Sequence, residues 1–298
     1  MQFSLWPGLV GQPWDDILAI SRLANTISWD GVWMADHFHS SDERRFGQLE
    51  CWTSLAAIAM AVPNVRVGAL VSGNTYRHPA VLANIAGTVD HISGGRVVLG
   101  IGAGWQQNEH AEYGIELPPV PQRMARFEEA CAILHSMLAQ PITDYSGEYY
   151  RLTDAPLEPR PVQKPIPLLV GGSGEKVTMR IVARYADEWN CWGTPEILQR
   201  KIGLFHEHCA REGRDPSTVA ISAQAIVSLG KDAPDIEYFR KLGLPILEGT
   251  AAQLRDAMGA YREAGVGEFV FPDVSAGEFD KRTAHIELFN AEVAAAFH

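Results

Sequence analysis

Cysteine is scarce in this chain, and its spacing offers no paired site. Only Cys51, Cys131, Cys191 and Cys209 occur among the 298 residues, and no two of them form a Cys-x-x-Cys pair. Neither a disulfide framework nor a cysteine-based metal site is therefore predicted. Buried free thiols in a reducing cytoplasm are the expected state.

Basic clusters, long apolar runs and a leader-like start are also missing. The chain carries 25 Lys and Arg against 36 Asp and Glu, for a net charge of −11. It therefore lacks the basic face that nucleic acid or an anionic membrane requires. The apolar stretch 55–62 is too short to span a bilayer, and residues 1–7 lack the features of a signal peptide. We expect a cytoplasmic protein with no nucleic-acid and no membrane partner.

Short apolar runs alternate with amphipathic stretches along almost the whole chain. The predicted strands are 2–5, 32–35, 65–71, 97–101, 168–171, 188–191, 219–227 and 268–271. The predicted helices are 14–27, 51–61, 79–92, 122–138, 175–185, 195–212, 251–264 and 280–297. Strict alternation favours parallel strands joined by helical crossovers. Eight such units predict an α/β fold, a single (β/α)8 TIM barrel, which typically needs roughly 250 residues. The whole chain, 1–298, is predicted to be one domain.

One stretch departs from this alternation. Residues 139–167 contain an aromatic run, Tyr145, Tyr149 and Tyr150, and five prolines from Pro156 onward. We interpret this stretch as a hairpin or loop insertion after the fourth helix, not as a linker between domains.

Two helix starts show recognisable capping chemistry. Thr194 precedes Pro195, and proline is well suited to the first helical position because its missing N–H needs no partner there. Thr250 and Gln253 have the spacing of a capping box.

Asp36 and His37 directly follow the second predicted strand, where a barrel of this kind builds its active site. A histidine there can exchange a proton near neutral pH, and the neighbouring carboxylate can orient it. A loop histidine bonded to a backbone carbonyl is the simpler alternative. His37 and His39 also suggest a metal-dependent amidohydrolase, but such an enzyme needs further ligands, and no other strand end supplies a convincing set.

Two glycine-rich segments follow predicted strands. Gly171, Gly172, Ser173 and Gly174 open a helix, where free backbone amides attract a phosphate and glycine permits close approach. A plain glycine turn with Ser173 as the helix cap is the alternative. The run 100–104 has the first two glycines of a dinucleotide fingerprint but lacks its third spacing and its acidic partner.

Taken together, these segments resemble the luciferase-like monooxygenase superfamily, in its branch of coenzyme F420-dependent oxidoreductases. The resemblance covers nearly the whole chain. It is carried by segments 29–31, 35–38, 76–79, 93–96, 102–105, 109–115, 171–176 and 184–187, together with Pro165.

The resemblance implies a barrel that binds a flavin-like ring at the carboxyl ends of its strands. Asp36 and His37 match the pair beside the ring, and Leu70, Val71 and Ser72 match the cofactor-binding segment that holds a non-proline cis peptide. Asn108 matches a residue that contacts the pyrimidine edge. The loop of Gly171, Gly172, Ser173 and Gly174 matches the phosphate-binding loop.

One departure separates this chain from the sugar-phosphate dehydrogenases of the branch. They have a glutamate, considered an acid, where this chain has Trp105, so neither that substrate nor that role is carried over.

The leading hypothesis is hydride transfer between coenzyme F420 and an unidentified small organic substrate, with His37 exchanging the proton and Asp36 orienting it. A monooxygenase that uses reduced FMN and the metal-dependent amidohydrolase remain alternatives. The resemblance also implies a homodimer.

Overall fold

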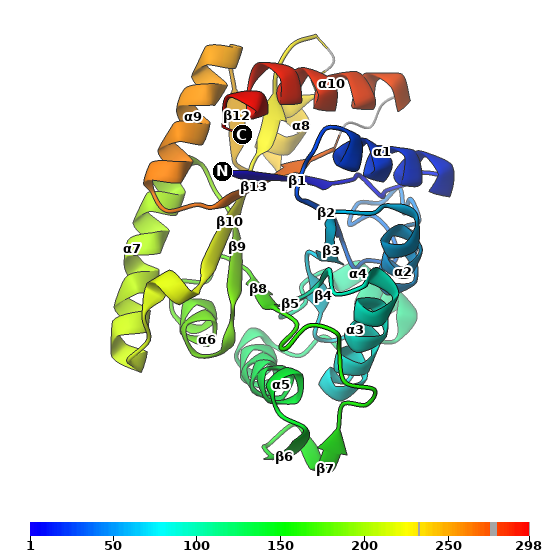
Figure 1. Cartoon of the computed structure of the whole chain (residues 1–298), viewed down its shortest axis with the longest axis vertical. Coiled ribbons are helices and arrows are strands. Elements are labelled where there is room, and N and C mark those ends of the chain that lie inside the picture. The colour runs from blue at the N-terminus through cyan, green and yellow to red at the C-terminus, as the bar shows by residue number, and fades with distance from the viewer. Residues whose placement is uncertain (232, 275–278, 298) are drawn as a thin grey trace.

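The computed structural model describes residues 1–231, 233–274 and 279–297 and shows a closed parallel barrel (Figure 1). Residues 232, 275–278 and 298, which fall within the predicted domain 1–298, lie outside the described residues. The barrel strands are β1 (Gln2–Trp6), β2 (Gly31–Met34), β3 (Arg66–Ala69), β5 (Val97–Gly102), β8 (Leu168–Gly171), β9 (Glu188–Trp192), β10 (Ala220–Gln224) and β13 (Glu268–Pro272). The predicted (β/α)8 barrel is confirmed.

Every neighbouring pair of these strands is parallel, and the ring closes through pairing of β3 with β5. A short strand, β4 (Ser72–Gly73), adds a second pairing at the end of β5. Parallel strands bury both faces, which explains their nearly continuous apolar sequences. Consequently all of their carboxyl ends meet at one rim, which we call the C-terminal rim.

The apolar core has two parts. The larger part lies between the strands and the surrounding helices. The smaller part consists of residues from different sides of the ring that meet inside it: Trp33, Leu70, Val98, Leu169 and Val270. Toward the amino-terminal ends of the strands, the Trp33 indole N–H donates to Glu268, and Arg66 pairs with Glu188. Packed side chains therefore plug the barrel, and ligands can be bound only at its ends.

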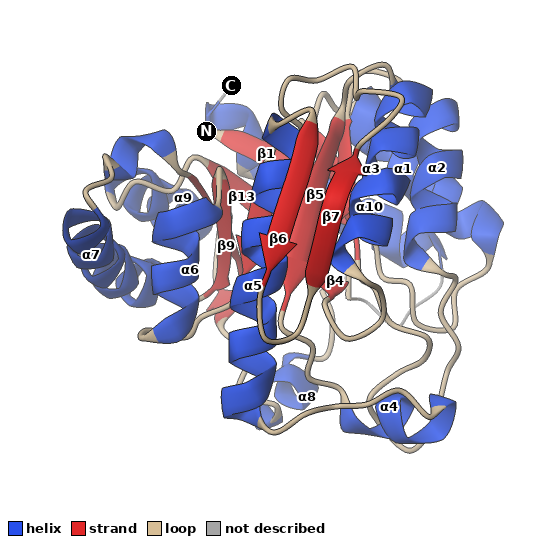
Figure 2. Ribbon diagram, turned by 90° about the horizontal axis from the view of Figure 1, so that it is seen from below, coloured by secondary structure: helices blue, strands red, loops and turns tan. Residues whose placement is uncertain are grey.

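The surrounding helices follow the predicted order. They are α1 (Trp14–Thr26), α2 (Cys51–Ala61), α3 (Pro79–Ser93), α5 (Val120–Ala139), α6 (Val177–Tyr185), α7 (Pro195–Glu212), α9 (Ala251–Glu263) and α10 (Phe279–Glu292). A further helix, α4 (Gln107–Tyr113), follows β5 and was not predicted. Figure 2 shows α4 beyond the barrel end at which the strands finish. None of the helices within the described ranges is long and apolar enough to cross a membrane.

Two other segments depart from the barrel repeat. The predicted strand 219–227 is wrong in its second half, because β11 (Ile226–Ser228) leaves the barrel and pairs with β12 (Ile246–Glu248) in a separate parallel pair. The helix α8 (Ile236–Lys241) connects them. Between α5 and β8, the strands β6 (Ile142–Ser146) and β7 (Arg151–Pro156) form an antiparallel hairpin beside α5 (Figure 2).

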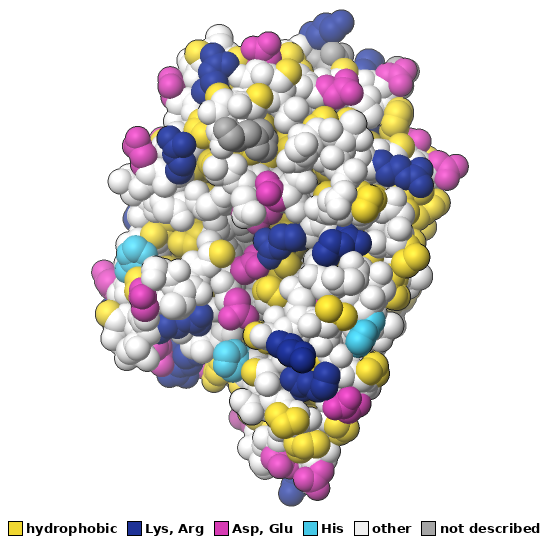
Figure 3. All heavy atoms as spheres, in the orientation of Figure 1, with side chains coloured by type: hydrophobic (Ala, Val, Ile, Leu, Met, Phe, Trp, Pro, Cys, Tyr) yellow, Lys and Arg dark blue, Asp and Glu magenta, His cyan; other side chains and the backbone are white. Residues whose placement is uncertain are grey.

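The surface carries charges of both signs. On the face shown in Figure 3, acidic and basic side chains are intermixed. Elsewhere in the described residues, charged side chains form short-range ion pairs, such as Glu128 with Arg180 and Arg184. Intermixed charges of this kind provide solubility but contribute little to stability individually.

The two predicted helix caps differ. Thr250 and Gln253 form the complete capping box at the start of α9. Thr194 does not cap α7, because its hydroxyl donates to the Glu196 carboxylate and accepts no backbone N–H.

We predict that Thr250→Ala lowers the free energy of unfolding by about 0.5–2 kcal/mol, since it leaves the Gln253 backbone N–H in the first turn of α9 without its side-chain acceptor. Thr194→Ala is the matched control and should change it by less than about 0.5 kcal/mol. Urea denaturation measures both. An equal loss in the two variants would contradict the assignment.

Candidate active site

The residues predicted to act together lie on the C-terminal rim. Asp36 and His37 follow β2, the Leu70–Val71 bond follows β3, Trp105 follows β5, and the glycine segment begins at the end of β8. Parallel strands bring these four ends together although more than a hundred residues separate them in the chain. The imidazole and the glycine turn therefore lie on the same side of the barrel, as the hypothesis requires.

The His37 ring is held by a carboxylate from α4. His37 Nδ1 lies 2.7 Å from Glu109 Oε1, and the Glu109 side chain is fully buried whereas 19% of the His37 side chain is exposed. An ionised carboxylate accepts the Nδ1 proton, which leaves Nε2 with its lone pair. Among the described residues, His37 Nε2 has no hydrogen-bond partner. A proton acceptor is thus presented at the rim.

Glu109 joins three segments of the rim. Besides His37, it accepts a hydrogen bond from the Phe38 amide at 2.9 Å and one from the Tyr76 hydroxyl. Burial raises the pKa of Glu109, but these three donors outweigh it and hold the pKa below its ordinary value. Burial, together with the hydrogen bond to Glu109, raises the pKa of Tyr76. Glu109 is therefore ionised and Tyr76 neutral over the physiological pH range.

Asp36 is placed differently from the prediction that it orients His37. Its oxygens accept two hydrogen bonds from Arg77, at 2.5 and 3.1 Å, and one from the Gly73 amide. Arg77 also bonds Glu50, which caps α2 through the Thr53 amide. Asp36 is 2% exposed. It therefore holds together the ends of β2, β4 and α2, and Glu109 takes the orienting role.

Burial decides the direction of the pKa shift of Asp36 in this pair but not that of Arg77. It raises the pKa of Asp36, and the hydrogen bonds and charge of Arg77 only partly offset that rise. Asp36 raises the pKa of Arg77 in turn, against the opposite effect of burial.

The Leu70–Val71 peptide bond is cis, as the resemblance implies. The Val71 side chain lies in a notch lined by glycines from two strands. A Cβ added at Gly102 would come within 2.6 Å of Val71, and one at Gly171 within 2.7 Å. Larger residues at these positions would displace Val71. Because Gly100, Gly102 and Gly171 lack side chains, they pack closely against Val71. We call this close-packed surface at the rim the glycine floor.

Two other predicted residues mainly contact the protein itself. The Ser72 side chain is fully buried and its hydroxyl accepts a hydrogen bond from the Trp52 indole. Asn108 donates to the Ser40 carbonyl and accepts from the Glu109 amide. Ser72 therefore supports the wall, and Asn108 connects α4 to the loop after β2. Their predicted contacts with a cofactor remain predictions.

The segment Gly171, Gly172, Ser173 and Gly174 forms an exposed turn before α6. Gly172 has a φ of 136°, which favours glycine. The carbonyl of Gly172 accepts from Trp189, and that of Ser173 accepts from Lys201. The Gly172 amide also donates to the Asn190 carbonyl, at 3.1 Å. With these groups held, the turn is fixed in a shape that leaves the amides of Ser173 and Gly174 for an anion. Ser173 is not the cap of α6, which begins at Val177.

Several buried polar groups near the rim lack partners. Both amide atoms of Asn74, which is 1% exposed, are without a hydrogen bond, as is the indole nitrogen of Trp6. The backbone amide of Asn74 donates to Gly102, so its side chain begins beside the glycine floor. Buried polar groups are normally paired. Together with the floor and the exposed turn, these groups fit a planar, polar-edged cofactor with an anionic tail.

The metal alternative finds little support in the ligand set. His39 is 6% exposed, its Nδ1 bonds the Ser40 carbonyl, and its Nε2 lies 3.2 Å from Glu112. The His37 ring is held by Glu109. Over residues 1–231, 233–274 and 279–297, no group of three or more His, Cys, Asp or Glu side chains is arranged to hold a metal ion.

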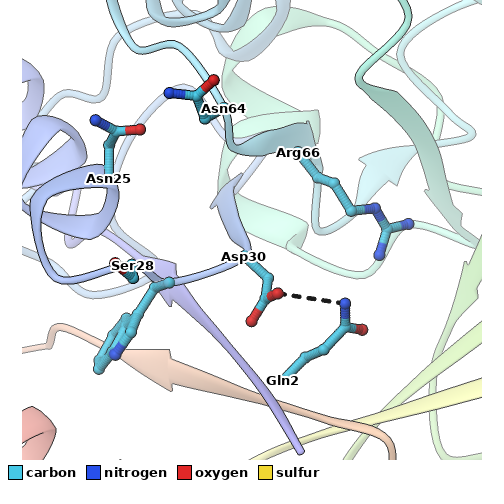
Figure 4. Close-up of a pocket in the computed structure, with 7 residues that line it drawn as sticks. Gln2, Asn25, Ser28, Asp30, Asn64 and Arg66 are labelled. Atoms are coloured by element: carbon cyan, nitrogen blue, oxygen red, sulfur yellow. Dashed lines mark hydrogen bonds between the residues drawn. The ribbon is translucent and has the colours of Figure 1, made fainter. Parts of the chain in front are cut away.

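A polar cavity of about 490 Å³ lies at the opposite end of the barrel (Figure 4). It is lined by Gln2, Asn25, Ser28, Trp29, Asp30, Asn64 and Arg66. Gln2 begins β1 and Arg66 begins β3, so this cavity is separated from His37 by the packed interior of the barrel. In barrels of this type that end contributes to stability rather than catalysis.

Residues 2–238 match the model of the luciferase-like monooxygenase family. The chain belongs to that family, and the predicted superfamily is confirmed. An F420-dependent glucose-6-phosphate dehydrogenase of Beutenbergia cavernae is 34% identical over 233 residues, or 76% of this chain and 68% of that enzyme. An uncharacterized protein of Mycobacterium tuberculosis is 27% identical over 265 residues, or 82% of this chain and 90% of that protein.

Solved structures show the same fold. An F420-dependent secondary alcohol dehydrogenase, in complex with an F420–acetone adduct, superposes with a TM-score of 0.86 at 21% identity, covering 100% of this chain and 99% of that one. The monooxygenase RslO1 from Streptomyces bottropensis superposes with a TM-score of 0.82 at 20% identity, covering 100% of both chains.

We predict that Arg77→Met lowers the free energy of unfolding by about 3–5 kcal/mol near neutral pH, because it leaves the buried Asp36 charge unpaired. Folding would then raise the pKa of Asp36 further above its unfolded value of about 3.9. The folded variant holds a proton that the unfolded chain releases, so its stability should fall as pH rises from that value to the folded pKa.

Urea unfolding at pH values spanning this window measures the effect. Glu50→Gln, which removes the charge of the partly exposed second partner of Arg77, is the control and should cost no more than about 1 kcal/mol. A loss for Arg77→Met that is small and independent of pH would show that Asp36 does not depend on Arg77.

Proposed function

We propose that this protein is an oxidoreductase that transfers a hydride between coenzyme F420 and a small organic substrate. The single observation that carries the proposal is the His37–Glu109 pair, which presents a proton acceptor on the same C-terminal rim as the glycine floor. The F420-dependent dehydrogenase of Beutenbergia cavernae, at 34% identity, favours F420 as the cofactor.

The chain offers a separate feature for each part of such a cofactor. The floor around Val71 suits a flat ring system, and the unpaired Asn74 amide suits the polar edge of that ring. The exposed turn of Gly172, Ser173 and Gly174 suits an anionic tail. When bound, deazaflavin supplies a ring carbon that accepts or donates the hydride.

His37 moves the proton that accompanies the hydride. With Nδ1–H donated to Glu109, Nε2 can take a proton from a substrate hydroxyl or return it to a carbonyl oxygen. Glu109 fixes the tautomer and stabilises the imidazolium that forms. Tyr76 and the Phe38 amide hold the Glu109 carboxylate in turn. Asp36 positions the end of β2 through Arg77 and does not touch the His37 ring.

A monooxygenase that uses reduced FMN is the second candidate on this fold. The likeness to RslO1 extends over the whole chain, but at 20% identity it concerns the fold. The floor and the glycine turn would suit FMN as well, so the test must compare the two cofactors directly.

We predict that the purified apoprotein binds F420 with a Kd in the micromolar range and binds FMN at least tenfold more weakly. Fluorescence titration with each cofactor measures both constants. Gly172→Val should weaken F420 binding, because its φ disfavours any side chain and the turn would lose its shape. Preferential binding of FMN would favour the monooxygenase, and binding of neither would refute the proposal.

Replacing His37 with Ala should reduce turnover with F420 by about 10²–10⁴-fold while the Kd for F420 changes little. Glu109→Gln should reduce turnover by about 10–100-fold, since it replaces a hydrogen bond to a charged group worth about 1.5–3 kcal/mol. It should also alter the pH–rate profile, because the imidazolium loses its counter-charge.

Stopped-flow or steady-state rates measure these effects. His206→Ala, at an exposed position on α7, is the control and should leave the rate unchanged. Wild-type turnover in the His37 variant would remove this residue from the reaction.

A further inference from the structure

We propose that Trp105 and His37 form a substrate subsite for an uncharged molecule with a planar apolar face, such as an aromatic secondary alcohol or its ketone. This inference deepens the proposed function and rests on it. It names the substrate class that the C-terminal rim accepts and assigns Trp105 as the residue that determines specificity.

The first support is the position of Trp105. Its side chain is among the largest apolar groups of the chain, yet Trp105 is 60% exposed. Its ring lies 5.4 Å from the His37 ring at an interplanar angle of 78°. The two rings thus form a corner. A planar group stacked on the free face of Trp105 would lie directly beside the imidazole that exchanges the proton.

The second support is that the arginines in the segments after β2 and β4 are paired with carboxylates. Arg77 is bound by Asp36, Arg45 lies 3.1 Å from Glu112, and Arg44 lies 2.5 Å from Asp42. Each of these three arginines, in the segments that follow β2 and β4, thus already pairs with a carboxylate of the chain. A phosphorylated substrate would have to compete with these carboxylates for an arginine, and at the corner itself it would approach the ionised Glu109 that pairs with His37. The corner therefore disfavours anions.

The third support is the apolar surface next to the corner. Phe38, the residue after His37, packs against Tyr113 with ring centroids 4.8 Å apart, and Tyr113 is 59% exposed. Elsewhere on the C-terminal rim, Trp6 ends β1 and Trp192 ends β9. Their ring centroids are 6.2 Å apart, and their planes meet at 83°. Aromatic groups thus occur on both sides of the rim, as in sites that bind apolar ligands and orient them with few polar groups.

The reaction on such a substrate is balanced by the proposed cofactor. In the oxidative direction the carbinol C–H bond breaks and its hydride, with two electrons, goes to oxidised F420. The hydroxyl O–H bond breaks and its proton goes to His37 Nε2, and the C=O bond of the ketone forms. The reverse steps reduce the ketone. Trp105 takes no part in bond changes and acts only by holding the apolar face.

The test compares 1-phenylethanol, propan-2-ol and glucose 6-phosphate as hydride donors to F420 in the holoenzyme. We expect KM for 1-phenylethanol to be the lowest. Trp105→Ala should raise that KM by about tenfold, the size expected for loss of an aromatic pair together with its buried area. It should leave KM for propan-2-ol nearly unchanged. Trp105→Phe should restore most of the loss, and Met60→Ala, which removes an apolar side chain that is 71% exposed on α2, should have no effect.

Saturation-transfer NMR of 1-phenylethanol on the holoenzyme provides a readout that does not depend on turnover. The inference is overturned if the wild type fails to bind 1-phenylethanol, if Trp105→Ala binds it as tightly as the wild type, or if glucose 6-phosphate is the preferred donor. If F420 itself fails to bind in the titration above, the proposed function fails. If F420 binds and the Trp105 variants behave like the wild type, only the subsite inference fails.

Discussion

The rim of this barrel depends on one buried carboxylate. Glu109 accepts hydrogen bonds from the His37 ring, the Phe38 amide and the Tyr76 hydroxyl, and so connects the loops after β2 and β4 to α4. A buried carboxylate is tolerated only when such donors surround it. The same contacts that stabilise its charge fix the tautomer of His37. Glu109 therefore supports both the packing of the rim and the proposed role of His37.

A second ionic centre lies beside the first but has a different role. Asp36 and Arg77 tie the end of β2 to β4 and α2, with both Asp36 oxygens occupied. Because the arginine is fully engaged, it adds no free positive charge to the rim. The result is a rim with paired charges at its base, exposed aromatic groups, and a glycine turn at the end of β8 that we propose as the anion site. This separation of charge is what suits a cofactor with an anionic tail and an uncharged substrate.

The sequence predicted the barrel well, because each strand is a short apolar run and the helices between them are amphipathic. It also predicted that His37 and the Gly171–Gly174 turn share a rim, which follows from parallel topology alone. It could not predict the contact between His37 and Glu109, which are 72 positions apart. The polar, seven-residue helix α4 has no apolar periodicity to reveal it. Likewise, the apolar run 219–227 does not show that its last part leaves the barrel for a second sheet.

The most direct test of the account is a crystal structure of the protein with F420 bound. The account predicts that the deazaflavin ring lies over Val71 with its reactive carbon facing His37 Nε2, and that its phosphate contacts the amides of Ser173 and Gly174. A ring bound elsewhere, for example in the polar cavity at the amino-terminal end of the strands, would contradict it. So would an imidazole turned away from Glu109 in the complex.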